Sequence, residues 1–108
     1  MPASQPVVSA PALQVVYVLV GPRASGKTIW AESNGKEECS FCKRELCALT
    51  RAGYPLGTIA ISSTRPDDIA LSDDALSLKA TTLLLDALGH FHVGSFTVEV
   101  LRFQRNEQ

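Results

Sequence analysis

The chain has 108 residues, a formal net charge of -1, and a composition that is 45% hydrophobic and 19% charged. A chain of this length forms a single domain with a modest core, and its composition excludes wholesale disorder. This net charge excludes the class of strongly basic proteins that bind DNA or RNA mainly through its phosphates, although it is compatible with a local basic patch.

The ends of the chain differ in composition from the rest. Residues 1–13 are rich in Pro, Ser and Ala and lack a long apolar core, so we expect a flexible arm rather than a secretory signal. One domain is expected over residues 14–104, followed by a polar tail over 105–108. Three cysteines without an export signal indicate reduced thiols and a cytoplasmic location. No apolar run is long enough to span a membrane, so no membrane partner is expected.

The first expected strand is the apolar, β-branched run Val15–Val20, which Gly21 and Pro22 end. Such a run is typical of a strand that is buried on both faces. A helix is then expected to begin at Gly26 or Lys27 and to stop at Asn34-Gly35.

A second helix is expected over Lys36–Ala52, and Gly53 and Pro55 end it. Its apolar residues recur at spacings of three and four and so share one face. They are Cys39, Cys42, Leu46 and Leu49. The next strand is expected over Leu56–Ser62.

The last helix is expected to begin after Ser72, a suitable N-cap, with acidic residues in its first turn. Its apolar face continues to Leu88, and Gly89 ends it. Ser95–Phe103 alternates enough to be a strand, less buried than the first two. Strands that alternate with helices predict an α/β fold, here a small three-layer, P-loop-like sandwich with a short, mostly parallel sheet.

The loop after the first strand matches the pattern G-x-x-x-x-G-K-[ST] at every fixed position. Two glycines let the backbone approach phosphate, while turned N–H groups and the following helix attract the anion. Lys27 supplies a cation for the β- and γ-phosphates, and Thr28 offers its hydroxyl to Mg²⁺. The predicted phosphate-binding residues are Gly21, Pro22, Arg23, Ala24, Ser25, Gly26, Lys27 and Thr28. A glycine-rich turn that merely joins strand to helix is the alternative.

The string GPRASGKT resembles the Walker A motif of the P-loop NTPase superfamily. A looser resemblance covers Thr58–Ile69, which is similar to the segment after motif I in superfamily 1 and 2 helicases. There, Ser63, Thr64 and Arg65 occupy the positions of an expected P-T-R, with serine in place of proline. The second resemblance implies that these three residues contact the backbone of single-stranded nucleic acid.

An acidic residue near Thr28 is needed to orient Mg²⁺ and to support catalysis. Asp67 and Asp68 follow the expected second strand, at the edge of the sheet where ligands bind in such folds. They are therefore candidate catalytic residues beside Lys27. Asp86 ends the run Thr82–Leu85, which also reads as a strand, but the helical pattern accounts for more of the sequence.

Other side chains allow further sites. Cys39-Ser-Phe-Cys42 begins like a zinc site, but four ligands are needed, so buried reduced thiols are the better interpretation. Cys47, His90 and His92 would complete the zinc set. Arg23, Arg65 and Arg102 are candidate phosphate contacts if the fold brings them together.

These patterns lead to a functional hypothesis with an alternative. The chain is expected to bind ATP with Mg²⁺, as a compact or partial NTPase or helicase-like domain that acts as an ATP hydrolase or phosphotransferase. ATP is preferred to GTP because no N-K-x-D guanine-reading motif occurs. No D-E-x-x box occurs either, which favours the alternative, a non-catalytic interaction module that works within a larger protein assembly.

Overall fold

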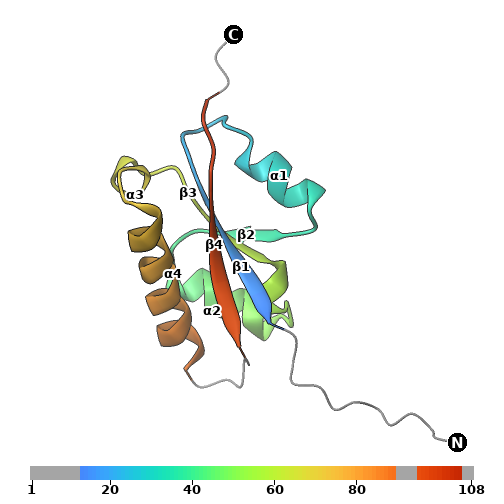
Figure 1. Ribbon diagram of the computed structural model, residues 1–108. Helices are drawn as coiled ribbons and strands as arrows, with labels where there is room; N and C mark the ends of the chain where they lie inside the picture. The colour runs from blue at the N-terminus through green and yellow to red at the C-terminus, as the bar shows by residue number, and fades with distance from the viewer. Residues whose placement is uncertain (1–12, 90–94, 106–108) are drawn as a thin grey trace, which may run out of the picture.

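The computed structural model describes residues 13–89 and 95–105. In chain order its elements are β1 (Gln14–Val20), α1 (Lys27–Ser33), β2 (Glu37–Cys39), α2 (Lys43–Arg51), the 3-10 helix η1 (Leu56–Thr58), β3 (Ile59–Ser63), α3 (Pro66–Ile69), α4 (Asp73–Leu88) and β4 (Phe96–Arg102) (Figure 1). The expected arm over residues 1–13 lies outside this part except for Leu13, and of the expected tail only Arg105 is described.

Within the described residues, the strands form one four-stranded parallel sheet in the order β2-β3-β1-β4. The central strand β1 pairs with β3 on one side, where Val18 faces Ile61, and with β4 on the other, where Val18 faces Val100. The expected α/β class and its parallel sheet are confirmed.

Helices cover both faces of the sheet, which gives three layers (Figure 1). Val16, Val18 and Val20 of β1 are buried against α2 and α4 in the larger apolar cluster. Leu19 points the opposite way and packs with Ala31 of α1 in the smaller one. Successive side chains of a strand point to opposite faces, so a run that is apolar at every position belongs in the middle of such a sandwich.

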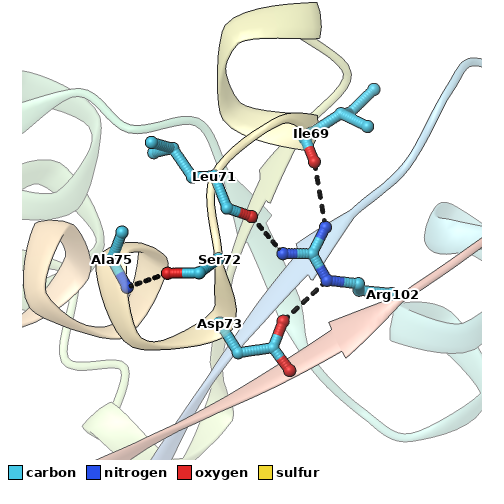
Figure 2. A network of polar contacts seen from close by, with 6 residues as sticks. All are labelled: Ile69, Leu71, Ser72, Asp73, Ala75 and Arg102. Carbon is cyan, nitrogen blue, oxygen red and sulfur yellow. Dashed lines mark hydrogen bonds and ion pairs between the residues drawn. The ribbon is translucent and has the colours of Figure 1, made fainter.

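The long helix α4 follows the pattern expected of it. Ser72 is its N-cap, and the Ser72 hydroxyl accepts a hydrogen bond from the Ala75 backbone N–H at 3.1 Å (Figure 2). The buried positions of the helix are Leu76, Ala80, Leu84, Ala87 and Leu88. Asp86 lies on this helix, exposed, and pairs with Lys43 at 3.4 Å, so the preferred helical interpretation of this segment is confirmed and the strand alternative is wrong.

The second helix differs from the prediction at its beginning. It begins at Lys43 rather than Lys36, because Glu37–Cys39 forms the edge strand β2. Cys39 pairs in register with Ile61 and is buried, whereas Cys42 is the helix N-cap in an extended conformation. The two cysteines therefore do not share a helix face. Three residues are too few to display a period of two, so pairing with β3 decides the conformation of this segment.

The strand after α2 and the loop after that strand also differ from the prediction. Leu56–Thr58 is a 3-10 turn, and the strand itself occupies Ile59–Ser63. The expected loop contains the four-residue helix α3, which has Pro66 in its first turn. Proline suits that position because its missing N–H would have no partner there.

Candidate phosphate-binding site

The loops after β1 and β3 open at the same edge of the sheet. From β1 the chain turns through α1 to reach β2, whereas from β3 it passes through α4 on the opposite face to reach β4. Neighbouring connections that leave in opposite directions open a crevice at the carboxyl ends of the strands, where ligands bind in parallel α/β sheets. The sequence motif therefore lies at the edge of the sheet where folds of this class bind their ligands.

The structure requires glycine at two positions of the loop, for a different reason at each. Gly26 has φ of 96°, a left-handed conformation that is costly for other residues, and it is the N-cap of α1. Gly21 lies against the end of β4, where an added Cβ atom would lie 2.5 Å from the Phe103 carbonyl oxygen. The fold itself therefore requires glycine at both positions, whether or not a ligand is bound.

Lys27 folds back into the loop that it follows. Its Nζ donates to the carbonyl oxygens of Gly21 at 2.8 Å and Pro22 at 2.7 Å, and to Ser25 Oγ at 3.2 Å. The residue is only 6% exposed. Burial lowers the pKa of Lys27 from its usual value, and the negative charge of Glu38 acts in the opposite direction. An ammonium group donates up to three hydrogen bonds, so an incoming anion must replace one of these acceptors.

A cavity of about 310 Å³ lies beside this loop. Its walls are Arg23, Ala24, Ser25, Gly26, Lys27, Thr28 and Ile29 from the loop and α1, together with Ser62 and Thr64 from the end of β3. Gly21 and Pro22 do not line it but hold the Lys27 ammonium in place. Sequence reasoning missed Ser62, whose contribution depends on the parallel pairing of β1 with β3.

The two aspartates proposed from the sequence have different environments. Asp67 is exposed on α3, whereas Asp68 is 2% exposed. Asp68 Oδ2 accepts from Ser63 Oγ at 2.6 Å, and Oδ1 forms an ion pair with Lys79 of α4. Burial alone would raise the pKa of Asp68, but the bonds from Lys79 and Ser63 outweigh it and hold the pKa below its usual value. This carboxylate is therefore ionised at neutral pH.

Asp68 lines a second cavity of about 240 Å³ rather than the first. The walls of the second cavity are Ser40, Phe41, Ser62, Ser63, Thr64, Arg65 and Asp68. The helicase-like positions Thr64 and Arg65 are exposed there, whereas Ser63 is buried and engaged with Asp68. The two cavities share Ser62 and Thr64, so they lie next to each other.

Of the candidate arginines, Arg23 and Arg65 line the two cavities and Arg102 lines neither. Figure 2 shows the Arg102 guanidinium facing the connection between α3 and α4. It donates to Asp73 Oδ1 at 2.6 Å, to the Ile69 carbonyl oxygen at 3.0 Å and to the Leu71 carbonyl oxygen. Arg102 therefore holds β4 to the beginning of α4 instead of facing the Gly21–Thr28 loop.

Cys39 lies on β2, whereas Cys42 is the N-cap of α2 and Cys47 lies within that helix. Cys39 is buried, which raises the pKa of its thiol to about 12, with the charges of Glu45, Cys42 and Glu38 acting in the same direction. Cys47 Sγ donates to the Ala87 carbonyl oxygen at 3.5 Å. In the ranges 13–89 and 95–105, no group of three or more His, Cys, Asp or Glu side chains is arranged to hold a metal ion. His90 and His92 lie outside the described residues.

None of the helices in the described ranges has the length and apolar character needed to cross a membrane. Comparisons of the chain with protein-family models, with curated protein sequences and with solved structures give no match.

Proposed function

We propose that the protein binds a nucleoside triphosphate, preferably ATP, in the cavity beside Gly21–Thr28. The observation that supports this most directly is the position of Lys27. Its ammonium is held inside the loop by two carbonyl oxygens and a hydroxyl, next to a cavity large enough for phosphate groups.

Charged phosphate oxygens would replace the neutral carbonyl and hydroxyl acceptors of Lys27 and form stronger hydrogen bonds with it. A phosphate oxygen carries negative charge, so its bond to an ammonium is about twice as strong as a bond between neutral groups. The backbone N–H groups around Gly26 and the Arg23 side chain border the same cavity. Together with Lys27 they would offset part of the negative charge of a triphosphate.

Mg²⁺ fits the same site through Thr28. The residue is exposed and lines the cavity, and Mg²⁺ in nucleotide sites takes one or two protein oxygens with phosphates and waters. When bound, the ion would neutralise charge on the β- and γ-phosphates. Asp68 is less suited to hold it directly, because it lines the second cavity and not the one beside Thr28.

Calorimetric titration of Mg²⁺ and ATP into the wild type and into Lys27→Ala tests the proposal. We expect binding by the wild type that is roughly 10- to 100-fold weaker in Lys27→Ala, since a charged hydrogen bond contributes about 1.5–3 kcal/mol. Arg51→Ala is the matched control, because Arg51 is exposed in the last turn of α2, near the opposite edge of the sheet. Circular dichroism verifies that each variant is folded. Equal affinities for all three proteins, or no binding by a folded wild type, would contradict the proposal.

One observation favours the alternative of a loop that binds nucleotide without hydrolysing it. Among the described residues, no carboxylate lines the phosphate cavity, so none is placed there to activate water. Under this alternative the domain would act as an interaction module in a larger assembly. Turnover of ATP with Mg²⁺, measured alone and with single-stranded DNA or RNA, distinguishes the two. Release of inorganic phosphate that disappears in Lys27→Ala would contradict the non-catalytic alternative.

A further inference from the structure

The second cavity adjoins the phosphate cavity and has its own chemistry. Ser62 and Thr64 form part of both, so a ligand in one lies against a ligand in the other. Its volume of about 240 Å³ is below the range of roughly 300–1,000 Å³ that drug-sized ligands occupy. The cavity therefore suits a small molecule rather than a second nucleotide.

The charges around the second cavity favour a ligand with a negative group. Asp68 is paired with Lys79, so its charge is already compensated. The Arg65 guanidinium lies on the wall as well, and it forms no hydrogen bond or ion pair within the part of the chain that the structure describes. The charge of Arg65 helps to lower the pKa of Asp68, but its N–H donors have no hydrogen-bonded partner among the described residues, so they suit a carboxylate or phosphate ester, which a guanidinium can bind through two parallel bonds.

The remaining walls are fixed before a ligand arrives. Ser40 is held by Glu45, which accepts from the Ser40 backbone N–H at 3.0 Å and from its hydroxyl at 2.8 Å. The Phe41 ring is half-buried and carries the Lys79 ammonium 4.5 Å from its centroid. Such a wall offers one apolar surface for the carbon skeleton of a ligand.

Asp68 is buried, and its carboxylate oxygens can still accept further hydrogen bonds. A carboxylate has about four lone-pair directions, and the bonds from Ser63 and Lys79 occupy two of them. The side chain is held by partners on two different elements, so its orientation is set in advance. A hydroxyl group in the second cavity could therefore donate to it.

We propose that the second cavity binds the acceptor of a phosphoryl transfer, a small hydroxy acid whose hydroxyl group meets Asp68 and whose negative group meets Arg65. This inference rests on the proposed binding of ATP in the first cavity. The hydroxyl oxygen bonds to the γ-phosphorus, the bond from that phosphorus to the β,γ-bridging oxygen breaks, and ADP leaves with its electron pair. The hydroxyl proton passes to the Asp68 carboxylate and from there to water. The products are a phosphate ester and ADP.

The test measures ester formation separately from nucleotide binding. ATP and Mg²⁺ are incubated with the protein and D-glycerate, D-gluconate or shikimate, and phosphorus NMR identifies the products. Propionate and glycerol are controls that lack the hydroxyl group and the negative charge, respectively. We expect a phosphate ester with at least one hydroxy acid and with neither control. Spectra of labelled backbone amides, recorded with a non-hydrolysable ATP analogue, should shift at Ser40, Phe41 and Arg65 when the reactive acid is added.

Two variants separate the role of Asp68, which accepts the hydroxyl proton, from the role of Arg65, which binds the negative group of the acid. Asp68→Asn should lower kcat for the ester about 100-fold or more while the affinity for ATP changes less than twofold. Arg65→Gln should raise KM for the acid about tenfold with little change in kcat. The controls are Asp74→Asn and Arg51→Gln, which alter exposed residues outside both cavities. Should Asp68→Asn fail to fold, Arg65→Gln still tests the site, because Arg65 is exposed.

Three results would overturn the inference. Normal ATP binding without ester from any of the acids removes the acceptor site and leaves the nucleotide site intact. Turnover that rises with single-stranded RNA or DNA, but with none of the acids, assigns the surface to nucleic acid instead. No ATP binding by the folded protein removes both proposals together.

Discussion

Replacing Gly21 with alanine tests the contact that joins the Gly21–Thr28 loop to the end of β4. The added Cβ would lie 2.5 Å from the Phe103 carbonyl oxygen and 2.9 Å from the Phe103 Cβ. Normal contacts between such atoms are about 3.5 Å, so one of the two backbones must move by nearly 1 Å. Both are restrained, because the Phe103 N–H donates to the Val20 carbonyl oxygen at 2.7 Å and the Gly21 N–H donates to the Ser63 carbonyl oxygen at 3.2 Å.

The cost follows from these contacts. Overpacking of a well-packed site costs about 1–3 kcal/mol, and weakening the bond to Val20 adds up to about 1 kcal/mol. Alanine recovers about 0.4–1 kcal/mol by restricting the unfolded chain. The net loss in the free energy of unfolding is therefore about 1–3 kcal/mol.

Urea denaturation followed by circular dichroism measures this loss. With a slope of about 1–3 kcal/mol per molar urea, the midpoint should fall by roughly 1 M. Gly57→Ala is the matched control, because the nearest atom to its added Cβ is Gln14 Oε1 at 4.0 Å. It should be neutral or slightly stabilising. If the two variants unfold at the same urea concentration, the close approach of Gly21 to β4 has no energetic consequence and the reasoning is refuted.

Three further predictions concern α4 and its partners. Leu84→Ala should lose about 2–5 kcal/mol in urea denaturation and the neighbouring Leu85→Ala about 0.5 kcal/mol or less, since the first residue is buried and the second is 59% exposed; similar losses would contradict the packing of this helix. Asp68 has a folded-state pKa below its usual value, so it stabilises the fold above about pH 4 and loses this effect as the pH falls through the folded-state pKa. Asp68→Asn should therefore flatten the acid limb of a stability–pH curve, and an unchanged limb would argue against the ion pair with Lys79. Ser72→Ala should cost about 1 kcal/mol of stability through loss of the cap, and no change in the urea midpoint would mean that water replaces the hydroxyl.

The strand and helix with the clearest sequence patterns were predictable because their signals are local. The apolar run that became β1 needs no knowledge of its neighbours, since burial on both faces leaves no polar position in it. The helix after Ser72 carries a cap, an acidic first turn and a stop at Gly89 within its own sequence. Each of these signals lies within a few residues of the feature that it predicts.

The features that were missed depend on partners far along the chain. The strand Glu37–Cys39 has two glutamates, which are poor strand formers, and it exists because Cys39 pairs with Ile61. The ion pair between Asp68 and Lys79 likewise joins two elements. One signal for it was present, a lysine within the apolar stripe formed by Leu76, Ala80 and Leu83, since a cation there needs a buried partner.

The candidate site likewise has one part that a local sequence pattern indicates and one part that depends on segments far apart in the chain. The loop Gly21–Thr28 could be singled out from the sequence because its glycines and Lys27 are close together in the chain, and the structure places residues 23–28 of that loop along one cavity. The second cavity was not predicted, because its walls come from the segments after β2 and β3. Only the sheet order places Phe41 near Asp68, and no local pattern specifies that order.

The contact between Gly21 and Phe103 has a consequence for synthesis on the ribosome. The loop is made early, but its base is held by the end of β3 on one side and by the end of β4 on the other. Until residues 96–103 have left the exit tunnel, β1 is the open edge of an incomplete sheet, with an apolar sequence that can pair with other chains. A nascent chain of this protein is therefore expected to need protection from aggregation until β4 has been made, and the contacts at the base of the Gly21–Thr28 loop are complete only when that strand is in place.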